Sequence, residues 1–203
     1  MFDLSVHQVA IRIGACLLVV AIHGLALSAI ALALGDHGPK FDERLTANPL
    51  QHLDLIGMPV MILTQAGWIK PMAIDPAALR FGPLGVILCV LASLGATLAG
   101  VALLVGLRVP ALAFLPNAFV PTIIATLNET AEVTAWFVAL NLVPLPPLTG
   151  MHLLAAIHPD IVPSSPRYQI YAGLALGALA LTGVIHTVLQ PIKTIIKSVL
   201  LGL

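Results

Sequence analysis

The chain has 203 residues, of which 59% are hydrophobic and 9% charged, and its mean hydropathy is +1.04. This composition indicates an integral membrane protein and excludes an ordinary soluble domain, which would need more polar surface. Nine basic and nine acidic residues give a formal net charge of zero, which argues against a nucleic-acid partner because such proteins carry a basic face. The expected surroundings are a lipid bilayer.

Long apolar segments follow one another along the chain. Four of them reach the ~20 residues that cross a hydrocarbon core of ~30 Å, at residues 8–34, 82–107, 131–157 and 169–190. Two shorter apolar stretches, at 55–66 and 111–127, contain prolines. The sequence therefore predicts an all-α membrane protein, a polytopic helical bundle of about 4–6 transmembrane segments.

The first apolar segment should stay in the mature chain, since it is too long for a signal peptide and contains Arg12 and His23. Further along, Pro49, Gly57 and Pro59 interrupt the region after Arg44. Backbone that leaves the helix at membrane depth must be covered by protein or line a cavity. We therefore expect a re-entrant loop or short sheet near residues 44–60. No repeat or linker divides the chain, which predicts one domain over residues 1–203.

Three separated segments contain sequence motifs. The first is "IHGLAL" at 22–27, the second is the block from 35 to 57 followed by "GWIKP" at 67–71, and the third is "NLVPLPPLTG" at 141–150. In this order they resemble the site-2 protease family of intramembrane zinc metalloproteases, peptidase family M50. The matching residues of the second and third segments are Gly35, Asp36, Arg44, Leu45, Thr46, Asn48, Pro49, His52, Asp54, Gly57, Gly67, Trp68, Lys70, Pro71, Asn141, Pro144, Pro146, Pro147, Leu148 and Gly150.

The resemblance implies a zinc site that this chain has lost. In active members the first helix supplies two histidine ligands and a glutamate base, and the third motif supplies an aspartate ligand. The corresponding residues here are His23, Gly24, Leu27 and Thr149. Because a catalytic zinc ion needs three protein ligands and a proton acceptor, we predict a degenerate, catalytically inactive member with no zinc.

The remaining motif residues predict a retained groove. The resemblance implies that this region holds an unwound substrate segment by strand addition, and the candidate groove residues are Asn48, Pro49, His52, Asp54, Asn141, Pro144 and Pro146. We therefore predict an accessory or scaffold subunit that binds a transmembrane segment of another integral membrane protein, in the bacterial inner (cytoplasmic) membrane. Local capping and turn hydrogen bonds would explain Asn48, His52 and Asp54 equally well.

Other interpretations stay open. His23 can be a buried histidine bonded to a neighbouring helix. Alternatively, His23, His52 and His152 form a rearranged site for zinc or copper, because His152 lies one helical turn after Thr149. The alternative function is then an active intramembrane zinc metalloprotease with an atypical metal site. Gly173 and Gly177 form a G-x-x-x-G pattern that allows close helix packing, within the bundle or against a partner.

Overall fold

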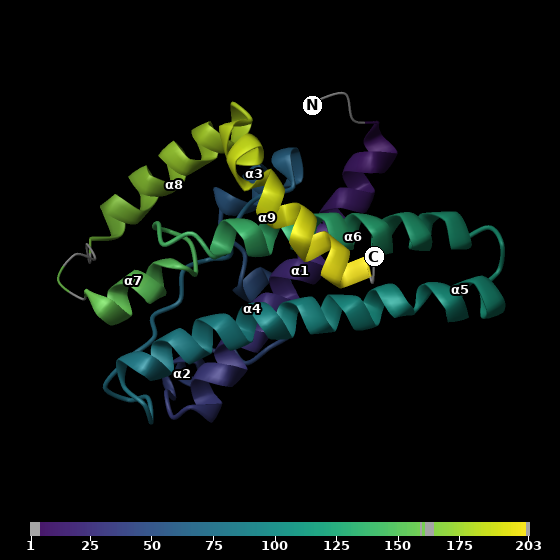
Figure 1. Ribbon diagram of the computed structural model, residues 1–203. Helices are drawn as coiled ribbons and strands as arrows, with labels where there is room; N and C mark the ends of the chain where they lie inside the picture. Colours follow the sequence, from purple (N-terminus) through teal and green to yellow (C-terminus); the bar gives the residue numbers. More distant parts are fainter. Residues whose placement is uncertain (1–4, 159, 161–164, 202–203) are drawn as a thin grey trace.

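The computed structural model describes residues 5–158, 160 and 165–201 (Figure 1). Its elements are α1 (Val6–Ala33), α2 (Gly38–Phe41), the 3-10 turn η1 (Pro49–Gln51), α3 (Gly57–Thr64), α4 (Pro83–Gly106), α5 (Arg108–Phe114), α6 (Val120–Asn141), α7 (Met151–Ile157), α8 (Pro166–Leu181) and α9 (Val184–Leu201). The all-α prediction is confirmed for this part of the chain.

Of the two alternatives expected near residues 44–60, the short sheet is not present, since the described residues there form loops, η1 and the start of α3; the re-entrant loop stays a prediction. Asn48 caps η1 by accepting a hydrogen bond from the Leu50 amide at 3.1 Å. Pro49 follows as the first residue of the turn, where its missing N–H is not needed. The chain therefore turns here and does not extend as a strand.

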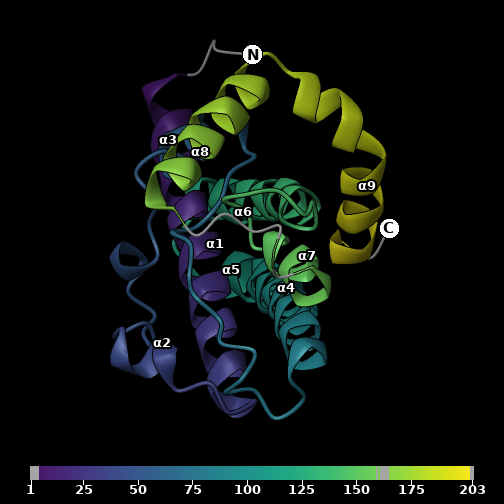
Figure 2. The same cartoon turned by 90° about the vertical axis from the view of Figure 1, so that its left-hand side faces the viewer.

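Helix α1 is the central helix of the bundle and packs against both α4 and α6, which it crosses in Figure 2. It begins at a capping box in which the Ser5 side chain accepts from the Gln8 amide and the Gln8 side chain accepts from the Ser5 amide. Its buried face includes Cys16, Val20 and Leu27. This packing fixes the middle of α1, where His23 lies.

Among the described residues, two helices are long and apolar enough to cross a membrane, Val6–Ala33 and the continuous stretch Pro83–Phe114. A third span results if α8 and α9 count as one broken helix, which bends by 80° at a break where Gly183 has a φ of +81°. The first two agree with the predicted segments 8–34 and 82–107. The predicted number of 4–6 is not confirmed.

The predicted segment 131–157 is not one helix. α6 starts earlier, at Val120, and ends at Asn141, and α7 starts only at Met151. The intervening residues include Pro144, Pro146 and Pro147, which lack the amide that helical hydrogen bonds need. The resulting loop brings the third motif back toward α1.

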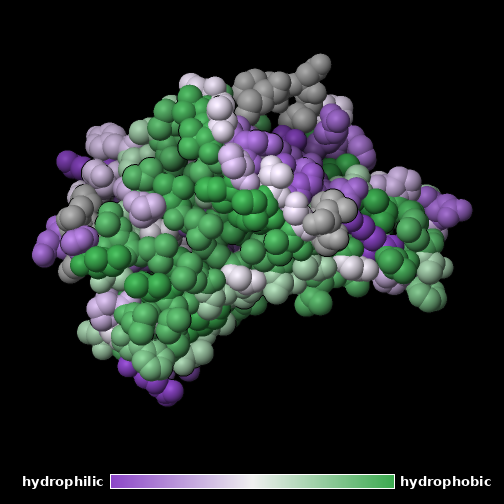
Figure 3. All heavy atoms as spheres, viewed as in Figure 1, coloured by the Kyte–Doolittle hydropathy of each residue, from purple (hydrophilic) through white to green (hydrophobic). Residues whose placement is uncertain are grey.

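The outer surface matches a membrane environment. Figure 3 shows apolar side chains over much of one face of the molecule. Leu84, Leu103 and Phe114 are more than half exposed, and such side chains on spanning helices contact lipid. Some charged residues inside the bundle form ion pairs: Arg12 Nε lies 2.6 Å from Glu129 of α6, and Glu132 contacts two lysines of α9.

Candidate functional site

His23 lies at the centre of the bundle with no exposed surface. The Thr97 hydroxyl donates to the Ser93 carbonyl at 2.7 Å, so its oxygen accepts from His23 Nδ1 at 2.9 Å. This assigns the proton to Nδ1 and leaves Nε2 to accept from the Thr149 hydroxyl at 3.2 Å. The Phe137 ring packs edge-on with its centroid 4.9 Å away. Both nitrogens of His23 are therefore satisfied, as expected for a histidine bonded to a neighbouring helix.

His52 fills the space beside Gly24. A Cβ atom added to Gly24 would lie 2.2 Å from His52 Cγ and 2.3 Å from Nδ1, so the imidazole rests directly on the glycine. His52 Nε2 donates to the Thr46 carbonyl at 2.9 Å, and Nδ1 is buried without a hydrogen-bond partner among the described residues. Burial lowers the pKa of His52 below its ordinary value, so the ring is neutral.

The loop after α6 places Thr149 against His23. Asn141 holds this loop, because its Nδ2 donates to the Gly67 carbonyl at 3.0 Å and its Oδ1 accepts from the Thr149 amide at 3.1 Å. A Cβ at Gly150 would lie 2.5 Å from the Val143 carbonyl oxygen, so this position requires glycine. Asn141 and Gly150 thus shape the third motif, as the residues of a structural turn.

The side chains around His23 do not fit a catalytic zinc ion. Its Nε2, the atom facing residue 149, is engaged by a neutral hydroxyl, and Leu27 occupies the next turn of α1 at 1% exposure. Over residues 5–158, 160 and 165–201, no three histidine, cysteine, aspartate or glutamate side chains form a group that could hold a metal ion. His23, His52 and His152 are therefore not assembled as a three-histidine site in this structure.

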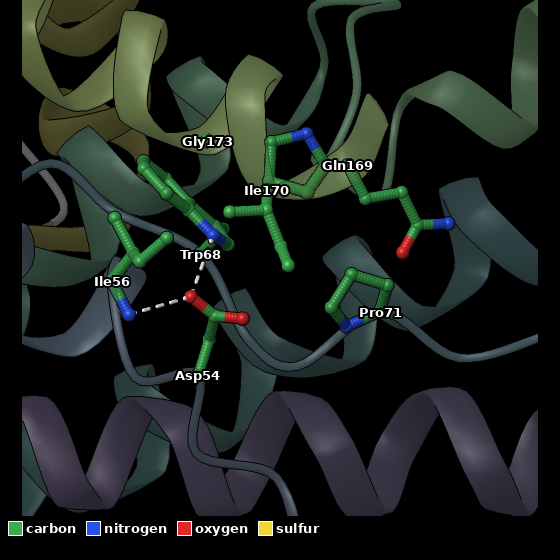
Figure 4. A pocket seen from close by; sticks show the side chains of 8 residues that line it. Asp54, Ile56, Trp68, Pro71, Gln169, Ile170 and Gly173 are labelled. Carbon is green, nitrogen blue, oxygen red and sulfur yellow. Dashed lines mark hydrogen bonds between the residues drawn. The ribbon is translucent and has the colours of Figure 1, made fainter. Parts of the chain in front are cut away.

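A groove lies beside this centre, and Figure 4 shows the first of its two cavities. It consists of two adjoining cavities of about 210 and 330 Å³ that share Pro71, Pro147 and Gln169. The first is also lined by Asp54, Ile56, Trp68, Ile170 and Gly173, and the second by Met72, Ala73, Pro146, Leu148, Met151, His152 and Ala155. Residues 66–75, the loop from 146 to 148, α7 and α8 thus form its walls.

One curated protein is similar to this chain. It is a protein of Bacillus subtilis (strain 168) named "Putative zinc metalloprotease YwhC", 28% identical over 152 residues, which are 73% of this chain and 67% of the relative. No family model matches the chain, and no solved structure matches it. The predicted resemblance to the site-2 protease family is confirmed. The loss of catalysis stays a prediction.

Two of the groove residues predicted from the site-2 protease resemblance line these cavities, Asp54 and Pro146. The Asp54 carboxylate also accepts from the Ile56 and Gly57 amides, at 2.9 and 2.6 Å, and from Trp68 Nε1 at 3.1 Å. It thereby starts α3 and orients the tryptophan. The others lie elsewhere: Asn48 caps η1, Pro49 is its first residue, His52 and Asn141 are fully buried, and Pro144 is exposed.

Sequence reasoning missed the α8 side of the groove. Gln169, Ile170 and Gly173 belong to no motif, and only the G-x-x-x-G pattern signalled that α8 packs closely. In the structure a Cβ at Gly177 would lie 3.0 Å from Val60 Cγ2. The small face of α8 therefore packs against α3 within the bundle. The role of Arg44 was also missed. Its guanidinium donates to the Lys70 and Pro71 carbonyls at 3.0 and 3.2 Å and so holds the groove wall in place.

Proposed function

We propose that this site-2-protease-like chain is catalytically inactive and acts as an accessory subunit. It binds an extended segment of another integral membrane protein, in the bacterial inner membrane. The observation that supports this most is the contrast between two neighbouring regions. The family's metal position is filled by the hydrogen-bonded His23–Thr149 pair and by the His52 ring on Gly24, whereas the groove beside it is open.

The chemistry at the former metal position supports a loss of hydrolysis. Metal-assisted hydrolysis needs a metal-bound water and a group that accepts its proton. Gly24 has no side chain to accept a proton, and a carboxylate placed there would collide with the His52 ring. Thr149 is neutral and donates a hydrogen bond to His23 Nε2. The described side chains supply neither the ligand set nor the base.

The groove wall supports binding of an extended segment. Residues 66–75 contain no helical residue, and Arg44 and Asn141 pin this wall through the carbonyls of Gly67, Lys70 and Pro71. A non-helical wall with fixed backbone can pair with an added strand, while adjacent pockets take its side chains. Trp68 and Ile170 offer an apolar pocket for such side chains.

Filling the groove should prevent partner binding. A photo-crosslinking amino acid at exposed Gln169, which lines both cavities, should capture a transmembrane segment in native membranes. Gly173→Leu should reduce this crosslink about tenfold, because the new side chain points among Trp68, Pro147 and Ile56 and removes contacts of order 1–2 kcal/mol. The yield is read by immunoblot and the captured segment by mass spectrometry.

Gly95→Leu is the matched control, since a Cβ at Gly95 meets nothing within 4 Å, and its crosslink yield should equal that of the wild type. Equal yields from Gly173→Leu and Gly95→Leu would rule out the groove as the binding site. A crosslink confined to lipid, or to this chain itself, would contradict an accessory subunit with a foreign partner.

The second candidate function is an active zinc metalloprotease with an atypical metal site, which the name of the relative favours. It predicts cleavage of a transmembrane substrate that depends on His23. We expect instead that purified wild type and His23→Ala give no product above that of protein-free vesicles. Cleavage by wild type that His23→Ala abolishes would replace the accessory-subunit proposal with this second function.

A further inference from the structure

A second groove lies at the far end of the α4–α6 hairpin and consists entirely of hydrocarbon. Helix α5 packs against α6, and between them is a cavity of about 350 Å³. Its lining residues are Leu107, Pro110, Ala111, Phe114, Leu115, Ile123 and Leu127. A cavity lined only by such side chains does not hold ordered water and is suited to an apolar chain.

One cation lies at this groove without a counterion. Arg108 begins α5, so Ala111, which lines the groove, follows it by one helical turn on the same face. Its Nε is buried without a hydrogen-bond partner, and Arg108 forms no ion pair with a carboxylate of the described residues. By contrast, Arg12 and Lys193 pair with glutamates of α6. Arg108 therefore lacks the anion that a cation in apolar surroundings needs.

The position of Arg108 along its helix indicates where that anion comes from. Arg108 lies within the candidate membrane span Pro83–Phe114. The neighbouring Leu103 and Leu112 are 76% and 63% exposed, and such side chains on a spanning helix contact lipid. An anion that reaches Arg108 from outside this chain is therefore a lipid headgroup.

We propose that this groove binds an anionic phospholipid, with its phosphate on the Arg108 guanidinium and one acyl chain between α5 and α6. The cation supplies charge complementarity and bidentate donors for phosphate oxygens, and the groove supplies hydrocarbon contact. The site is separate from the groove around Trp68 and does not depend on the accessory-subunit proposal.

Native mass spectrometry of the purified full chain tests this site with phosphatidylglycerol and phosphatidylcholine of identical acyl chains. The wild type should bind phosphatidylglycerol about fivefold more tightly, as expected for one basic residue at the membrane surface. Arg108→Gln should bind both lipids equally, and Arg108→Lys should keep most of the preference. Arg80→Gln, in the exposed loop before α4, is the matched control and should keep all of it.

Two further measurements separate the headgroup from the acyl chain. Phe114→Gln makes the groove polar and should weaken the binding of both lipids. The preference for phosphatidylglycerol over phosphatidylcholine should stay. Soluble glycerol phosphate should not compete, because it lacks the chain. A wild-type preference that survives in Arg108→Gln would overturn the phosphate contact. Unchanged binding by Phe114→Gln, or full competition by glycerol phosphate, would overturn the acyl-chain site.

Discussion

Gly24→Ala is expected to destabilise this protein strongly, although alanine favours helices over glycine. The new methyl group would lie 2.2 to 2.6 Å from three atoms of the His52 ring, which is itself fully buried. Overpacking of a closed core costs about 1–3 kcal/mol and sometimes more. We expect a clear drop in the midpoint of thermal unfolding, measured in detergent by circular dichroism.

The cause of this drop is tested by a double-mutant cycle with His52→Ala. The single variant His52→Ala leaves a cavity and should also destabilise. Because the alanine at position 24 partly fills that cavity, the double variant should be more stable than the sum of the two single effects implies. Gly95→Ala on α4, where the methyl group meets nothing, controls for the helix itself. Additive effects at 24 and 52 would show that the two residues are not in contact.

This contact illustrates what sequence could and could not predict about the site. The missing base and ligands at Gly24, Leu27 and Thr149 are visible from the motif alone. That the His52 ring occupies the space beside Gly24 is set by how the loop after α2 folds onto α1. His52 was predicted instead as a groove residue, because its motif says nothing about which way the imidazole points.

The fold was predictable wherever the length of an apolar segment alone determines a helix. α1 and α4 are uninterrupted apolar runs, and both were found within a few residues of their bounds. The continuity of α6 was missed, because the polar residues Asn128, Glu129 and Thr130 separate the predicted stretches 111–127 and 131–157, and Glu132 follows closely. These charges are tolerated only because Arg12 and Lys193, distant in the sequence, pair with them. A hydropathy pattern does not contain such pairings.

The groove depends even more on packing between distant segments. Gln169, Ile170 and Gly173 line it because α8 lies against α3, and the small side of α8 allows that approach. The close fit of Gly177 to Val60 was foreseeable as helix packing. The loop that α8 covers could not be foreseen from the sequence, because the 80° bend between α8 and α9 sets the orientation of α8.

The double variant Leu27→His with Thr149→Asp is expected to bind about one equivalent of zinc, whereas each single variant binds almost none, because three protein ligands are needed. His23 Nε2 already faces residue 149, at 3.2 Å from the Thr149 hydroxyl, and residue 27 lies one turn along the same buried face of α1. The metal content of the purified proteins, measured by plasma mass spectrometry, gives the stoichiometry.

Leu25→His with Thr149→Asp is the matched control, because residue 25 points away from residue 23 on the helix, and it should bind no zinc. The metal-binding double variant should still not cleave substrate, since Gly24→Glu is also needed to supply the proton acceptor. That glutamate in turn requires the His52 ring to move, because the ring occupies its space in this structure. Restoring hydrolysis therefore takes the three motif changes together with a shift of His52. One equivalent of zinc in the unmodified protein would refute this account and show that another metal site exists.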